Sequence, residues 1–79
     1  MTLDQLLPGS SATITSVAWD DLAPEEALRL RALGIDQGAE VTMAHRGVFG
    51  GSDPLAITLG RMTVALRRAH AKAIEVELL

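Results

Sequence analysis

The sequence contains no cysteine and no tyrosine, and only one tryptophan and one phenylalanine among its 79 residues. Without cysteine, the chain can form neither a disulfide bond nor a zinc site built on thiolates, and it suits a reducing compartment. Because aromatic residues are scarce, the 48% hydrophobic content has to build a small core from Leu, Ala, Val and Ile. A chain of this length predicts one domain that covers residues 1–79.

The sequence also lacks a long apolar run. No window reaches the roughly 18 uncharged apolar residues that a membrane-spanning helix requires. Residues 1–11, MTLDQLLPGSS, have neither the basic start nor the apolar centre of a signal peptide. We therefore predict a soluble, cytoplasmic protein without direct membrane insertion.

Positive charge is scarce in the first half of the chain. Residues 1–40 hold seven acidic and two basic side chains, whereas residues 41–79 hold three acidic and five basic ones. The overall net charge of −3 argues against a dedicated nucleic-acid binder, whose phosphate contacts need a basic face. The basic second half, with Arg67 next to Arg68, leaves a small-barrel regulatory or nucleic-acid-associated module as an alternative.

Apolar and polar residues alternate in several short segments, which is typical of half-buried strands. The predicted strands cover residues 11–19, 39–46, 55–59, 62–66 and 73–78. In the first of them, Ile14 and Val17 are three residues apart and cannot both face inward in a regular strand. We therefore predict a bulge near Thr15 and Ser16. Gly60 followed by Arg61 predicts a two-residue hairpin turn between the third and fourth strands.

One clear helix is predicted between the first and second strands. Pro24 suits the first helical turn, and Gly34 suits the left-handed residue that ends a helix. Shorter helical turns are expected at residues 2–6 and 67–72. The first turn places Leu3, Leu6 and Leu7 on one side, where they can plug an open end of the core.

An open sheet of five strands would expose long edges that can pair with other chains. Closing the sheet into a barrel removes most of this exposure. The predicted fold is therefore mainly β. It is a small five-stranded SH3-like barrel, with one helix between strands 1 and 2 and short helical turns at residues 2–6 and 67–72.

The order of short motifs along nearly the whole chain resembles the FeoA family, the small cytoplasmic component of the bacterial ferrous-iron transport system. The residues that carry the resemblance are, in chain order, Leu3, Leu6 and Gly9; Ile14; Arg29-Leu30, Leu33-Gly34 and Gly38; Asp53-Pro54; Gly60; Ala65-Leu66-Arg67; and Ala71, Ile74 and Val76. The chain departs from the family pattern at Ser52, where a glycine is common, and in a longer glycine-rich loop before Asp53. It starts at Met1 without DNA-binding helices, so it resembles the standalone form of the domain.

The resemblance implies a non-enzymatic adaptor with no cofactor. Its expected partner is the membrane ferrous-iron transporter that carries a cytoplasmic GTPase domain, and weak self-association is a further option. Such an adaptor would stabilise one arrangement of the GTPase region. The sequence itself shows no cysteine nucleophile, and the segment GVFGGSD, residues 47–53, lacks the Lys-Ser/Thr of a phosphate-binding loop.

Direct binding of ferrous iron is a weaker alternative. The two histidines, His45 and His70, are 25 residues apart, and Asp53 is the carboxylate considered with them. A stable ferrous site needs several such ligands to converge. Because nothing in the pattern forces that convergence, no metal site is predicted, and an iron chaperone using these three residues stays the alternative function.

Six residues are the candidates for binding a partner. They are Leu28 and Ile35 around the helix, Val48 and Phe49 in the glycine-rich loop, and Arg67 and Arg68 on the last turn. Apolar groups on a loop or helix surface can anchor a complex when they lose contact with water on docking. The ordinary alternatives are that the apolar residues pack against the barrel and that the arginines are solvated.

Overall fold

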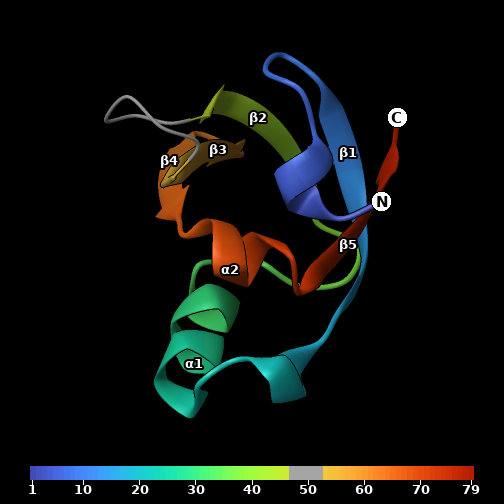
Figure 1. The fold of residues 1–79 in the computed structure, drawn as a ribbon. Coiled ribbons are helices and arrows are strands. Elements are labelled where there is room, and N and C mark those ends of the chain that lie inside the picture. The colour runs from blue at the N-terminus through green and yellow to red at the C-terminus, as the bar shows by residue number, and fades with distance from the viewer. Residues whose placement is uncertain (47–52) are drawn as a thin grey trace.

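The computed structural model describes residues 1–46 and 53–79. The elements in chain order are the 3-10 turn η1 (Leu3–Gln5), β1 (Ser11–Val17), the 3-10 turn η2 (Trp19–Asp21), α1 (Pro24–Ala32), β2 (Glu40–Arg46), β3 (Leu55–Leu59), β4 (Met62–Leu66), α2 (Arg68–Ala71) and β5 (Ile74–Leu78). The strands form one antiparallel sheet in the order β4-β3-β2-β1-β5. The sheet curls around an aliphatic core, and both helices lie below its open side in the view of Figure 1. The predicted mainly β, five-stranded fold is confirmed.

Side chains from every strand fill the core. The fully buried large residues are Leu3, Leu6, Ile14, Leu30, Ile35, Val41, Met43, Leu55, Ile57, Leu66 and Ile74. Trp19 is only partly buried and packs against the edge of this cluster, where the Arg31 guanidinium lies 4.2 Å from the centre of its ring. The core is therefore almost purely aliphatic, as the composition predicts.

The predicted irregularity in the first strand is present. The register between β1 and β5 shifts between Ile14 and Ser16. Ile14 is buried, and Val17 is partly buried against the core. The extra residue restores the inward direction for both side chains, because the side-chain period of a strand is two. The bulge prediction is therefore confirmed.

A Schellman motif ends α1. Gly34 has a φ of +96° and donates its N–H to the carbonyl of Arg31, while Ile35 donates its N–H to the carbonyl of Leu30. The left-handed glycine reverses the chain, so the following residue turns back under the helix. Ile35 therefore enters the core beside Leu30 and is 0% exposed.

The N-terminal turn plugs one open end of the barrel. Leu3 and Leu6 are buried, as predicted, but Leu7 is 64% exposed. The expectation that all three leucines share one side is wrong because the helical turn ends early. Leu6 already has extended dihedral angles, which turns the next residue toward solvent. Within the two described segments, no helix is long and apolar enough to cross a membrane.

Candidate functional site

An open groove of about 530 Å³ lies where α1, the start of β3, the end of β4 and α2 meet. Figure 1 shows α2 between α1 and the strands. The described residues that line the groove are Glu26, Arg29, Asp53, Pro54, Ala65, Leu66, Arg67 and His70. Five of these eight side chains carry charge or can gain it, so the groove is suited to polar recognition.

Glu26 links the two helices on one wall of the groove. Its Oε1 accepts a hydrogen bond from Arg29 Nε at 2.6 Å, one turn further along α1. Its Oε2 lies 3.5 Å from His70 Nδ1 on α2. A single carboxylate thus lies between a guanidinium from its own helix and an imidazole from the other helix.

Asp53 holds the opposite wall. It precedes β3, and its Oδ1 accepts a hydrogen bond from the backbone N–H of Arg68 at 2.7 Å. This N–H is in the first turn of α2, where no intrahelical acceptor exists, so a carboxylate is a favourable partner. The bond ties the start of β3 to α2 and leaves Asp53 engaged in holding the fold.

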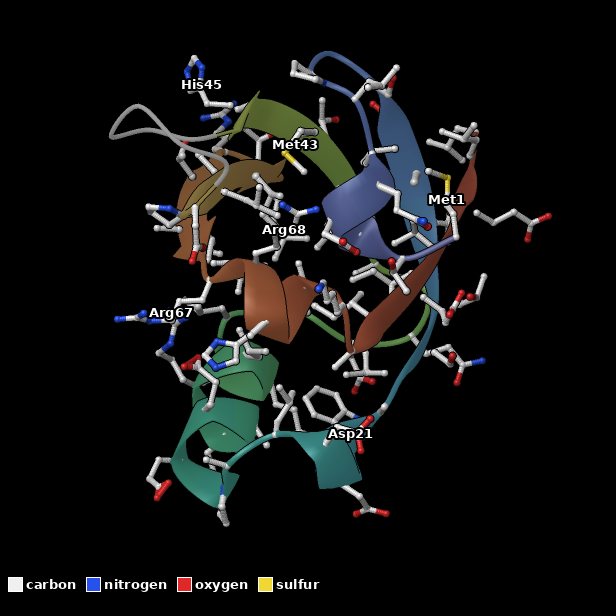
Figure 2. All side chains as sticks on the ribbon, viewed as in Figure 1. Met1, Asp21, Met43, His45, Arg67 and Arg68 are labelled. Carbon is white, nitrogen blue, oxygen red and sulfur yellow. The ribbon has the colours of Figure 1, made fainter. Side chains whose placement is uncertain are left out.

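The two adjacent arginines of the last turn point in different directions, as Figure 2 shows. Arg67 lines the groove, is exposed and extends away from the molecule. Arg68 turns toward η1, and its Nε lies 3.8 Å from the buried carboxylate of Asp4. The two arginines therefore differ in surroundings, and a role in partner binding stays a prediction for both: Arg67 extends into solvent, whereas the Arg68 side chain is 43% exposed beside the N-terminal turn.

The candidate iron ligands are only partly brought together. Asp53 and His70 line the same groove, whereas exposed His45 lies at the far end of β2 (Figure 2). Among the described residues, no group of three or more His, Cys, Asp or Glu side chains could hold a metal ion. The structure therefore does not assemble the set of His45, Asp53 and His70.

The apolar candidate residues differ in their exposure to solvent. Leu28 is 70% exposed on α1 and stays available to a partner. Ile35 is buried by the turn at Gly34, so the prediction that it contacts a partner is wrong. Sequence reasoning could have found this from the motif itself, since the residue after a helix-ending glycine commonly packs back onto the helix. Val48 and Phe49 lie outside the described residues.

Among the described residues that line the groove, none carries a hydroxyl or thiol group. The pair of His70 and Glu26 could orient a polar ligand, and no described serine, threonine or cysteine stands beside this pair as a nucleophile. The arrangement can offer charge, hydrogen bonds and a shallow apolar floor. These are the properties of a recognition surface.

The family match covers almost the entire chain. Residues 1–78 match the FeoA domain. The chain belongs to the FeoA family. This family is associated with iron transport, and it is not a known enzyme family.

Solved FeoA structures share the fold. The FeoA protein of Stenotrophomonas maltophilia, solved with zinc, is 40% identical to this chain, with a TM-score of 0.78 over 98% of this chain and 89% of that one. It is described as a prokaryotic SH3 domain protein and a candidate activating factor of ferrous iron transport. FeoA of Chlorobium tepidum is 32% identical, with a TM-score of 0.86 over 100% of this chain and 70% of that one.

Iron(II) transport protein A of Clostridium thermocellum is 28% identical, with a TM-score of 0.85. This chain is covered completely and spans 46% of that protein. A sequence search of curated proteins gives no match. The predicted family and the SH3-like fold are thus confirmed.

Proposed function

We propose that the chain is a non-enzymatic, cytoplasmic adaptor of bacterial ferrous iron uptake that binds the GTPase region of the membrane ferrous-iron transporter. Membership of the FeoA family supports the link to iron transport. The observation that carries the proposal is the charged groove between α1, β4 and α2, which offers charged and hydrogen-bonding side chains for recognition. A recognition surface of this kind is what an adaptor needs.

Leu28 gives the proposal a residue to test. It projects from α1, the helix that also supplies Glu26 and Arg29 to the groove, and a leucine with 70% exposure is a natural anchor for a partner. Phe49 is the second anchor expected from the sequence. An adaptor anchored in this way acts by stabilising the transporter conformation that it binds best.

The test is a binding measurement between the full chain and the soluble cytoplasmic region of the cognate transporter. Leu28→Asp and Phe49→Ala should each weaken binding by on the order of tenfold or more, about 1.4 kcal/mol. Leu79→Asp is the matched control, because Leu79 is 71% exposed and lies at the C-terminus, away from the groove. Absence of binding at tens of micromolar, together with unchanged iron uptake after deletion of the gene, would refute the proposal.

Direct Fe(II) binding through His45, Asp53 and His70 stays the alternative function. Asp53 and His70 line the same groove, but no set of three such ligands converges among the described residues. Calorimetry of the chain with Fe(II) under anaerobic conditions decides it. Binding heat that disappears in His70→Ala and persists in His45→Ala would support an iron site in the groove. Equal heats in all three proteins would eliminate it.

A further inference from the structure

Among residues 1–46 and 53–79, no strand lies beside the outer edge of β4. β4 stands at one end of the strand order and pairs with β3, from Leu55 with Leu66 to Leu59 with Met62. In a hairpin closed by a two-residue turn, the two residues that flank the turn form a hydrogen-bonded pair. Further along the hairpin, hydrogen-bonded and non-hydrogen-bonded pairs alternate. Met62, Val64 and Leu66 therefore bond to β3, whereas the backbone groups of Thr63 and Ala65 face outward.

One contact confirms this direction. Arg29 Nη2 donates to the carbonyl oxygen of Ala65 at 3.5 Å, so this carbonyl points away from β3 and toward α1. The long contact comes from an exposed side chain, which can move aside. An extended peptide joins a sheet edge through backbone hydrogen bonds. The Arg29 guanidinium N–H occupies the position that a backbone N–H of such an added strand would take.

The surroundings of this edge select the charge of its occupant. Arg61 lies in the turn before β4 and Arg67 directly after it, and within the described residues neither guanidinium has a hydrogen-bond or ion-pair partner. The two carboxylates nearby are engaged, Glu26 by Arg29 and Asp53 by the N–H of Arg68. The unpaired charge along β4 is therefore positive, and it complements an acidic segment.

The same arginines argue against a second copy of this chain as the occupant. Pairing two β4 edges antiparallel would bring Arg61 of one copy close to Arg67 of the other. Flanking charges of this kind are how natural sheets prevent edge-to-edge association. An acidic segment of another protein meets no such repulsion.

We propose that an extended, acidic segment of the partner polypeptide adds to the outer edge of β4 as a further strand and places a carboxylate in the groove against Arg67. Backbone hydrogen bonds to Thr63 and Ala65 provide affinity, and Arg61 and Arg67 provide selectivity. The inference rests on the proposed function, since it assigns the segment to the cytoplasmic region of the transporter.

Two variants of the full chain test the proposal against that cytoplasmic region. Thr63→Pro removes the outward N–H and places a ring where the added strand would lie, so binding should weaken by on the order of tenfold or more. Ala23→Pro is the matched control, because Ala23 lies outside β4 and its φ of −61° already suits proline. Arg67→Glu should weaken binding by a similar factor, whereas Lys72→Glu, the same charge change outside the groove lining, should change it less than about threefold.

A measurement on the unmodified chain covers the case in which Thr63→Pro fails to fold. The amide hydrogens of Thr63 and Ala65 should exchange more slowly in the complex than in the free chain, because strand addition gives them hydrogen-bond partners. Raising the salt from about 50 mM to about 500 mM should weaken binding, since the exposed charges are screened.

The possible failures can be told apart. If the cytoplasmic region does not bind the unmodified chain, both the proposed function and this inference fall. If it binds and Leu28→Asp weakens it, while Thr63→Pro binds as tightly as the unmodified chain or amide exchange is unchanged, the adaptor function stands and the edge proposal is wrong. A single-stranded oligonucleotide that binds the chain without the transporter, and that displaces the cytoplasmic region from it, would overturn the assignment to an acidic peptide.

Discussion

The two edges of the sheet are finished in different ways. The outer edge of β5 is covered by the chain's own N-terminus. The N–H of Val76 donates to the carbonyl of Met1 at 2.8 Å, and Thr2 forms a β-bridge with Glu75. Figure 1 shows the N-terminus lying against β5. The outer edge of β4 has no such cover among the described residues and is flanked by arginines.

The cover on β5 is held by its own local structure. The N–H of Thr2 donates to Gln5 Oε1 at 2.9 Å, and the hydroxyl of Thr2 bonds to the buried carboxylate of Asp4. Leu3 anchors the turn in the core. The comparison indicates that backbone hydrogen bonds along the β5 edge contribute to the stability of the fold. Charges beside the β4 edge oppose pairing with another copy but leave its backbone groups available to a partner.

The largest expected effect comes from releasing the cover of β5. Leu3→Ala should lower the free energy of unfolding by about 2–5 kcal/mol, because Leu3 is fully buried and its loss leaves a cavity. Urea unfolding followed by circular dichroism measures it. Leu7→Ala, in the residues that follow the same turn and 64% exposed, should change stability by less than about 0.5 kcal/mol. Equal losses in the two variants would show that the turn does not anchor the edge.

A pair of proline substitutions compares a central strand with the β4 edge. Thr42 lies in β2 between β1 and β3, and its Oγ1 is 2.7 Å from Ser11 Oγ. Thr42→Pro should cost about 2–4 kcal/mol, because it removes this side-chain bond and a ladder hydrogen bond. Thr63→Pro should cost less than about 1 kcal/mol in the free chain, because its N–H faces outward.

Thermal unfolding of the two variants under identical conditions gives the difference. A loss from Thr63→Pro as large as that from Thr42→Pro would mean that the Thr63 N–H is bonded within the fold. The edge of β4 would then be closed, and the comparison between the two edges would fail.

The smallest effect is expected from the ion pair on β5. The N-terminal ammonium lies 3.4 Å from Glu75 Oε2, and the Glu75 side chain is 53% exposed. Glu75→Gln should reduce stability by less than about 0.5 kcal/mol, because water and salt screen exposed pairs. Glu77→Gln on the same strand is the control, and chemical denaturation at low and high salt is the measurement. A loss above about 1 kcal/mol would show that charge, and not backbone, closes this edge.

Much of the local structure could be predicted because it depends on short-range rules. The spacing of Ile14 and Val17 predicted the bulge, and Gly60, with a φ of +62°, predicted the hairpin turn. Pro24 and Gly34 predicted the limits of α1. In each case a side-chain period or a backbone conformation restricted to glycine left few alternatives.

The surroundings of the predicted site residues were harder to predict, because they are set by segments that are distant in the sequence. Ile35 is hidden by the reversal at Gly34, and Arg68 is turned inward by Asp4, which is 64 residues earlier in the sequence. The groove combines Glu26 of α1, Asp53 of the segment before β3, and His70 of α2. No local pattern in the sequence shows which of these side chains share a surface.

The sequence by itself determined the class of the fold, the family and the absence of cysteine chemistry, because periodicity, turn residues and composition are properties of neighbouring positions. Only the tertiary structure decided which sheet edge the N-terminus covers, which arginine faces solvent and where the helices leave a groove. Those outcomes depend on contacts between residues far apart in the chain, since burial and hydrogen bonding are settled by the packing of whole elements.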